Sequence, residues 1–257
     1  MGTTRRIRLD ILVVDRGLAE TRSRAQALIL AGRVRVNNSM ASKTGLQVSI
    51  DADVQLSERD HPFVGRGGLK LTHAFDQFNI DVRGRTALDI GASTGGFTDV
   101  MLHRNARHVV ALDVGRGQLD WRLRNDSRVT VMEGINARYL TAADFPVSLR
   151  AFSCVTIDVS FISLKLILPV LAPLLAINSD IAALVKPQFE AGRSEVGKGG
   201  IVRDPIIHAR VVEEVIAAAD TLGLRHMSTT ASPILGAEGN REFFLHLRNR
   251  NRTKSDA

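Results

Sequence analysis

Apolar and polar residues follow two different rhythms along the chain. Up to about residue 60 the apolar stretches are short and are separated by turns. Helices are expected there at 8–16 and 22–31, and short strands at 33–37, 46–50 and 53–57. From residue 86 onward, longer apolar runs typical of buried strands alternate with amphipathic stretches typical of helices. The pattern therefore predicts a small α+β domain followed by a larger α/β domain.

The larger part has the order of a parallel sheet with helices on both faces. Strands are expected at 86–91, 108–113, 129–133, 154–159 and 180–186, and helices at 69–79, 96–104, 117–124, 162–176 and 205–222. Two final strands, 224–232 and 241–248, have no helix between them, which predicts an antiparallel hairpin at the edge of the sheet. The expected fold class is therefore α/β, with a mostly parallel sheet and an antiparallel edge hairpin.

Local composition sets the expected domain boundaries. The segment RDHPFVGRGG is rich in proline and glycine, which is typical of a linker. We assign the first domain to residues 1–60, the linker to 61–68 and the second domain to 69–248. The polar end of the chain, 249–257, is predicted to be disordered.

Overall composition narrows the class of protein. Of the 257 residues 44% are hydrophobic, which excludes a disordered chain. The longest uncharged apolar run, Leu166–Ile177, is too short for a membrane span, which needs roughly 20 residues. The single cysteine, Cys154, excludes a disulfide framework and a cysteine zinc cluster, and the histidines show no metal-ligand spacing. The N-terminus has no apolar signal core, so we expect a cytoplasmic protein without a membrane partner or a metal.

Positive charge is concentrated in the first fifth of the chain. Residues 1–50 hold nine Lys or Arg and three Asp or Glu, whereas the remainder holds 25 basic and 24 acidic residues. A small basic module beside a nearly neutral one is typical of a polyanion-binding attachment, and aromatic residues are too few for extensive base stacking. The basic residues predicted to contact RNA phosphates are Arg22, Arg24, Arg33, Arg35, Lys43 and Arg66.

A glycine-rich turn marks the expected ligand site. The run Ala87-Leu-Asp-Ile-Gly-Ala-Ser-Thr-Gly-Gly-Phe97 is an apolar strand, a turn and the start of a helix, and the next strand ends in Asp113. Its glycine spacing differs from the dinucleotide fingerprint, so a nucleoside ligand without a diphosphate is favoured, and S-adenosylmethionine fits. The predicted cofactor-binding residues are Gly91, Ser93, Thr94, Gly95, Gly96, Phe97, Asp113, Asn136 and Asp158.

The same turn also matches the nucleophile elbow of α/β-hydrolases. Ser93 lies in a G-x-S-x-G pattern between a strand and a helix, and Asp158 and a histidine (His208, His226 or His246) follow in the hydrolase order. Against this alternative, the turn follows the first strand of its domain, and no oxyanion loop is apparent before it.

Four charged residues are expected at one edge of the sheet. Asp158 and Lys186 end parallel strands, Glu242 opens an antiparallel strand, and Lys70 lies at the start of a helix. Such a cluster suits methylation of a ribose 2′-hydroxyl, because a base must remove the hydroxyl proton as the oxygen attacks a methyl group. We assign Lys186 as the base, with its pKa lowered by the nearby charge of Lys70. The alternative for any one of them is a surface salt bridge.

With these motifs in order along the chain, the sequence resembles the TlyA family, which is often labelled haemolysin A. Its first part resembles the small RNA-binding fold named after ribosomal protein S-four, through Thr21-Arg-Ser-Arg-Ala-Gln-Ala-Leu-Ile and Gly32-Arg-Val-Arg-Val-Asn37. The rest resembles FtsJ-type ribose methyltransferases, through Gly65-Arg-Gly-Gly-Leu-Lys70, the glycine turn, Asp113-Val-Gly-Arg-Gly-Gln-Leu119, Ile157-Asp-Val-Ser-Phe-Ile-Ser163, Val185-Lys-Pro-Gln-Phe-Glu190 and Gly197-Lys-Gly-Gly-Ile-Val-Arg-Asp-Pro205.

The resemblance implies a Rossmann-like enzyme that methylates cytidine 2′-hydroxyls of ribosomal RNA in ribosomal subunits, with S-adenosylmethionine as methyl donor. It implies a catalytic tetrad of Lys70, Asp158, Lys186 and Glu242, with Glu238 as the alternative fourth member. Three other functions stay open: a non-catalytic RNA-binding protein, a small-molecule methyltransferase, and a membrane-active cytolysin, as the family label says. The sequence leaves open the nucleotide, the ribosomal subunit, the oligomeric state and the orientation of the domains.

Overall fold

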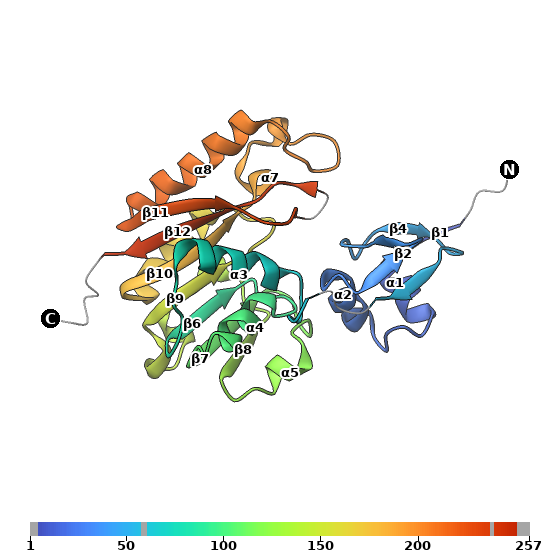
Figure 1. Cartoon of the computed structure of the whole chain (residues 1–257), viewed down its shortest axis with the longest axis horizontal. Helices are drawn as coiled ribbons and strands as arrows, with labels where there is room; N and C mark the ends of the chain where they lie inside the picture. Colours follow the sequence, from blue (N-terminus) through green and yellow to red (C-terminus); the bar gives the residue numbers. More distant parts are fainter. Residues whose placement is uncertain (1–4, 58–60, 237–238, 251–257) are drawn as a thin grey trace.

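The computed structural model describes residues 5–57, 61–236 and 239–250, which form two lobes (Figure 1). The N-terminal lobe is the predicted α+β unit. It contains β1 (Arg6–Arg8), α1 (Leu9–Asp15), α2 (Arg22–Leu30), β2 (Val34–Val36), β3 (Ser39–Met40), β4 (Gln47–Ser49) and β5 (Val54–Leu56). Strands β3, β2 and β5 form one sheet, and β1 pairs with β4. Strand β1 was not expected, because its sequence is short and largely polar.

A buried carboxylate holds the two helices of this lobe together. Asp10 in α1 is fully buried and accepts hydrogen bonds from Arg8, Arg22 and Gln26. Burial alone would raise the pKa of Asp10, but these hydrogen bonds, led by the one from Arg8, hold it well below its usual range. Arg22 is therefore committed in part to a structural ion pair, at 3.0 Å from Asp10.

The C-terminal lobe is built on one seven-stranded sheet. In chain order its elements are α3 (Gly67–Phe78), β6 (Thr86–Ile90), α4 (Gly96–His103), β7 (His108–Asp113), α5 (Trp121–Arg124), β8 (Val129–Glu133), β9 (Phe152–Ile157), α6 (Leu168–Leu171), β10 (Leu175–Val185), α7 (Pro187–Glu190), α8 (Pro205–Asp220), β11 (Leu224–Ala231) and β12 (Phe243–Asn249). The strand order is β11-β12-β10-β9-β6-β7-β8. Strands β10 to β8 run parallel, and β12 is antiparallel to both of its neighbours, which confirms the α/β fold class and the edge hairpin.

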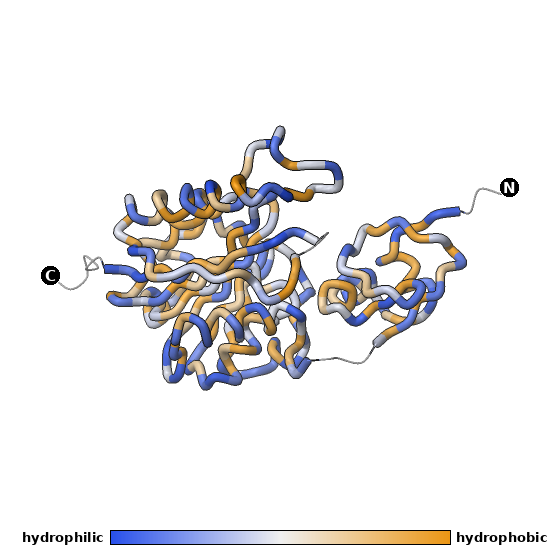
Figure 2. The backbone as a smooth tube through the Cα atoms, turned by 45° about the horizontal axis from the view of Figure 1, so that its top comes forward, coloured by the Kyte–Doolittle hydropathy of each residue, from blue (hydrophilic) through white to orange (hydrophobic). Residues whose placement is uncertain are grey.

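Side chains of alternate strand residues pack into two apolar layers, one on each face of the sheet. On one face, Leu88, Val155 and Ile181 pack with residues of α6 and α8. On the other face, Ala87, Cys154 and Leu184 pack with α3, α4 and α5. Figure 2 shows hydrophobic stretches in both lobes, and the N-terminal lobe has a separate apolar cluster of its own. The alternation expected of a sheet buried on both faces is therefore present.

Two predicted helices are wrong in extent. The segment 162–176 does not form one helix but two 3₁₀ turns and the four-residue α6, because Pro169 and Pro173 each remove a backbone N–H donor. The helix predicted at 117–124 is reduced to α5, which starts only after its cap, Asp120. At the C-terminal end β12 extends to Asn249, which is buried, although this residue was assigned to the polar tail.

The sheet topology identifies the edge at which a ligand would bind. From β6 the chain first builds outward through β7 and β8, and then returns to the other side of β6 with β9 and β10. Ligands bind beyond the carboxyl ends of parallel strands at such a switch point. The antiparallel register pairs Val185 with Phe243, so Lys186 and Glu242, the next residues outward, lie at this same edge.

Candidate active site

A cleft of about 760 Å³ opens at the carboxyl ends of β6, β9 and β10. Its walls include the glycine turn after β6 and all four predicted catalytic residues, Lys70, Asp158, Lys186 and Glu242. Each of the four comes from a different segment of the chain. The N-terminal lobe completes the cleft with Leu30, Ser42, Lys43 and Thr44. The predicted convergence of distant charges is therefore present.

The four charged residues form two ion pairs. Lys186 Nζ lies 2.6 Å from Asp158 Oδ1, and Lys70 Nζ lies 2.5 Å from Glu242 Oε2. Lys186 also donates a hydrogen bond of 2.9 Å to the hydroxyl of Ser160. Both lysine side chains are only 12% exposed, so they are largely shielded yet still reach the cleft. Glu238, the alternative to Glu242, lies outside the described residues.

Pairing changes the expected acidity of Lys186. Burial alone would lower the pKa of Lys186, but the carboxylates of Asp158 and Glu242 outweigh it, and the pKa is raised above its ordinary value. The pKa of Asp158 is lowered, because Lys186 and then Lys70 outweigh the effect of its burial. The prediction that Lys70 lowers the pKa of Lys186 is therefore wrong for the free protein, since each lysine has its own carboxylate partner.

Glycine is required at the first position of the turn. Gly91 has a φ of +82°, and a Cβ atom there would overlap the carbonyl oxygen of Asp158. The backbones of the two strand ends can therefore approach each other closely. Gly95 serves packing instead: a Cβ atom there would overlap the side chain of Leu123. Gly95 does not line the cleft, whereas Gly91, Ser93, Thr94, Gly96 and Phe97 do.

Asp113 holds the shape of the turn. Its two carboxylate oxygens accept hydrogen bonds from the backbone N–H groups of Ser93 and Gly115, both at 2.7 Å. Asn136 is exposed and caps a short 3₁₀ turn by accepting from the N–H of Arg138. Neither Asp113 nor Asn136 is among the residues lining the cleft, so their assignment to the cofactor stays a prediction.

The hydrolase alternative is wrong. The hydroxyl of Ser93 donates to Gln118, at 3.3 Å. The three candidate histidines are bound elsewhere: His208 to the carbonyl of Val202, His226 to Thr229, and His246 to Asp180, inside strands β12 and β10. Ser93 therefore has no histidine base within the described part of the chain.

Comparison with known proteins agrees with this architecture. The family model of FtsJ-like methyltransferases matches residues 63–249, and that of the S4 domain matches residues 7–54. The chain belongs to the FtsJ-like methyltransferase family. It is 51% identical to YqxC of Bacillus subtilis over 95% of this chain and 86% of YqxC. It is 48% identical to the 16S/23S rRNA (cytidine-2′-O)-methyltransferase TlyA of Mycobacterium tuberculosis, over 95% of this chain and 90% of that protein.

A solved structure extends the likeness to both lobes. A hemolysin-labelled protein from Streptococcus thermophilus is 45% identical and superposes with a TM-score of 0.75, over 97% of this chain and 90% of that one. The resemblance to the TlyA family, predicted from the motifs, is confirmed by these relatives. The protein is thus a methyltransferase with an RNA-binding S4 domain.

The basic residues of the S4 domain occupy different environments. Arg24 and Arg35 are exposed, and Arg33 is half-buried, with its guanidinium donating to the carbonyl of Ser57 at 2.7 Å. Lys43 is exposed at the rim of the methyltransferase cleft. Arg66 also lines the cleft, and it packs against Gly32, where a Cβ atom would lie 2.6 Å from its Cδ. The predicted basic residues therefore do not form one uniform patch.

Phe161 is a cleft residue that was not singled out from the sequence. Its side chain is 91% exposed, and its φ is +66°, which is unusual for a bulky residue. The ring lies 5.0 Å from that of Phe189, at 50°. An exposed, strained aromatic residue at a functional cleft indicates a binding role. Its only sequence signal is its position three residues after Asp158.

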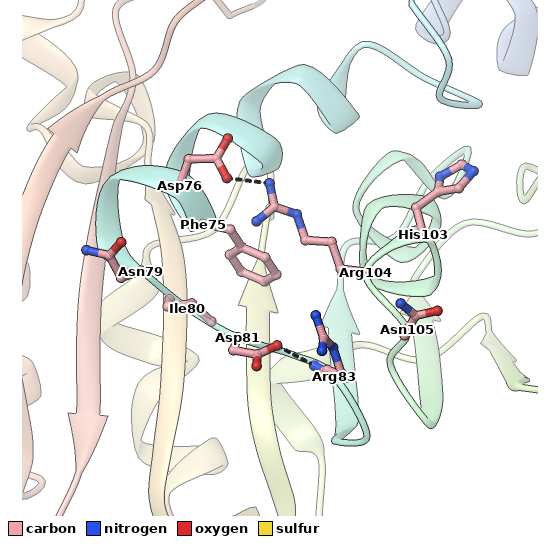
Figure 3. A pocket seen from close by; sticks show the side chains of 9 residues that line it. All are labelled: Phe75, Asp76, Asn79, Ile80, Asp81, Arg83, His103, Arg104 and Asn105. Atoms are coloured by element: carbon pink, nitrogen blue, oxygen red, sulfur yellow. Dashed lines mark hydrogen bonds and ion pairs between the residues drawn. The ribbon is translucent and has the colours of Figure 1, made fainter.

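A second hollow, of about 540 Å³, lies near the amino ends of the strands (Figure 3). Several of its charged residues already have partners. Arg104 pairs with Asp76 at 2.7 Å and lies over the ring of Phe75, and Asp81 accepts from the N–H of Arg83. The hollow belongs to the edge of the sheet opposite the methyltransferase cleft, and none of the predicted catalytic residues lines it.

Proposed function

We propose that this methyltransferase transfers a methyl group from S-adenosylmethionine to the 2′-hydroxyl of a cytidine in ribosomal RNA. The observation that carries the proposal is the meeting of Lys70, Asp158, Lys186 and Glu242 in one cleft beside the glycine turn. The four residues come from segments distant in sequence, and they form two largely buried ion pairs in the wall of the cleft. Such pairs are costly to desolvate, and are therefore typical of functional sites.

The cleft fits the proposed methyl donor. Gly91 and Gly96 line the cleft, and a Cβ atom at either would crowd the neighbouring backbone, so the glycines allow the close backbone packing that shapes this wall. The volume of about 760 Å³ lies within the range of small-molecule sites. Asp113, at the end of β7, has further lone pairs that can accept from ribose hydroxyls. When bound, S-adenosylmethionine supplies a methyl group activated by a sulfonium. The residues of this chain would hold it and align the acceptor.

Lys186 is the proposed general base. Its amine would take the proton of the 2′-hydroxyl while the sugar oxygen forms its bond to the methyl carbon, and the carbon–sulfur bond breaks to leave a thioether. Lys186 must be neutral to do so, and it loses its proton more readily when a cationic methyl donor lies beside it. Asp158 and Ser160 orient the amine, and the Lys70–Glu242 pair fixes the other side of the cleft.

The acceptor is proposed to be ribosomal RNA. Support comes from the S4 domain, from the basic residues Arg24, Arg35 and Lys43, and from the names of the TlyA relatives. The exposed ring of Phe161 offers a stacking face for an unpaired base, as is common in RNA recognition. A ribosomal substrate would place the protein in the cytoplasm.

The label hemolysin points to a second candidate function. Among the described residues, no helix combines the length and the apolar character that crossing a membrane requires. The charged residues that line the described cleft favour proton transfer. Catalysis by the cleft is therefore the function that the geometry supports best.

The deciding experiment uses the full chain, methyl-labelled donor and purified small and large ribosomal subunits. We expect label in RNA of at least one subunit, at a ribose identified by its resistance to alkaline cleavage. Heat-inactivated protein serves as the control. Absence of label from the RNA of both subunits would overturn the proposal. Release of dye from liposomes without added methyl donor would favour the cytolysin instead.

A further inference from the structure

Gln188 carries a hydrogen-bonding group that the fold leaves unused. It lies in α7, two residues after Lys186, and its side chain lines the cleft. Its Oε1 atom is buried and has no hydrogen-bond partner among the described residues. A buried acceptor that lacks a donor destabilises the folded protein. A polar atom in this state at the wall of a binding cleft indicates that a ligand supplies the missing donor.

The position of Gln188 indicates that this ligand is the nucleoside that accepts the methyl group, and not the methyl donor. The methyl-donor half is expected around the glycine turn after β6, with Asp113 on the far side at β7. Gln188 follows β10, which is separated from β6 by β9 and lies on the side away from β7. Its neighbour in α7, Phe189, packs against Phe161, the exposed ring. A group that reaches Gln188 therefore belongs to the nucleoside that presents its ribose to Lys186.

We infer that Gln188 reads the base of the target nucleoside by accepting a hydrogen bond from its exocyclic amine. This inference rests on the proposed function. Among pyrimidines, cytosine presents an N4 amine donor at the position where uracil presents a keto oxygen acceptor. An amide that presents its oxygen as the acceptor therefore selects cytidine over uridine.

The test combines a protein change with an RNA change. Gln188→Met removes the amide at similar length, and ribosomal subunits reconstituted with uridine at the mapped target position remove the amine. Gln77→Met, at an exposed site on α3, is the matched control. Steady-state kcat/KM is measured for all combinations, donor affinity by calorimetry, and folding by thermal unfolding. The uridine substrate with the wild-type protein keeps the test informative even if the Gln188 variant folds poorly.

Each single change is expected to lower kcat/KM about tenfold, the equivalent of one hydrogen bond, with donor affinity unchanged. The two changes together should lower it no further than either alone, because they remove the same contact. Equal rates on cytidine and uridine, multiplicative losses, or weaker donor binding by Gln188→Met would overturn the inference. A wild-type protein that labels no RNA would instead refute the proposed function, so the two failures are distinguishable.

Discussion

Strand β10 carries one charged cluster at its middle and a second just beyond its carboxyl end, and the two have opposite designs. At the middle, the buried Asp180 accepts from Arg85 at 2.6 Å, from Arg248 and His246 at 2.8 Å, and lines none of the cavities described above. At the carboxyl end, Lys186 and Asp158 form a single close pair that faces a large cleft. Asp180 has several hydrogen-bond partners inside the fold, whereas Asp158 forms one close ion pair, with Lys186, and lines the cleft.

The difference separates charge that stabilises the fold from charge that is available for chemistry. Burial alone would raise the pKa of Asp180, but hydrogen bonds from His246, Arg85 and Arg248 hold it well below its usual range. Asp180 therefore stabilises the native state at neutral pH, and this contribution is lost as the pH falls below about 4. At the cleft, Lys186 has one close carboxylate partner, and its amine can accept a proton once it has lost its own. The clusters should respond differently to mutation.

The largest effect is expected from Lys186→Met. Removing the proposed base should lower kcat by about a thousandfold or more, since general-base catalysis contributes about 10²–10⁴-fold and Asp158 also loses its partner. Donor affinity measured by calorimetry should change little. Lys165→Met, at a surface ion pair with Glu214, is the control and should keep wild-type turnover. Wild-type turnover by Lys186→Met would remove this lysine from the mechanism.

Asp180→Asn should act on stability instead. It leaves the half-buried guanidinium groups of Arg85 and Arg248 without their carboxylate, and breaking such a cluster costs about 3 kcal/mol. Denaturant unfolding measures the loss, and kcat of the folded fraction should stay near the wild-type value. Asp76→Asn, which breaks the more exposed pair with Arg104, should cost less than about 1 kcal/mol. A larger loss in Asp76→Asn than in Asp180→Asn would contradict the comparison.

The sequence predicts which residues reach the cleft better than it predicts their partners. Apolar runs ending in Asp158 and Lys186 place both at one edge of the sheet, because parallel strands share a direction. Pairing depends on the β10–β12 register and on the position of α3, neither of which a local pattern contains. The acidity predicted for Lys186 was wrong for this reason. The packing of Gly95 against Leu123 is equally absent from the local pattern, because it joins two separate segments. Its assignment to the methyl donor stays a prediction.

The pH dependence of the reaction sharpens the comparison at the cleft end. Since pairing with Asp158 raises the pKa of Lys186, the neutral base is scarce in the free protein near pH 7. The value of kcat/KM for the methyl donor reports the free protein, and it should rise about tenfold per pH unit between pH 7 and 9. The kcat profile reports the bound state and should level off at lower pH. A plateau in kcat/KM below pH 8 would contradict a paired Lys186.

The smallest effect concerns Asp89, a third buried carboxylate of the same sheet, whose partners among the described residues are neutral donors. It accepts from Thr98 at 2.6 Å and from Thr156 at 3.0 Å. Burial raises the pKa of Asp89 to about 7, although both hydroxyls oppose the shift and the negative charge of Asp158 adds to it. Without a cation nearby, burial decides the direction and the pKa of Asp89 is raised. At Asp158 and Asp180 the nearby positive groups outweigh burial, and the pKa values are lowered.

This contrast predicts a pH-dependent difference between the wild type and Asp89→Asn. Between about pH 4 and 7 the native state keeps a proton on Asp89 that the unfolded chain has released, so the wild type loses stability as the pH rises. Asparagine does not titrate. The free energy of unfolding of the wild type relative to the variant should therefore fall by about 2.5 kcal/mol from pH 5 to pH 8. Urea unfolding of both proteins across that range measures it, and a constant difference would show that Asp89 is already ionised at pH 5.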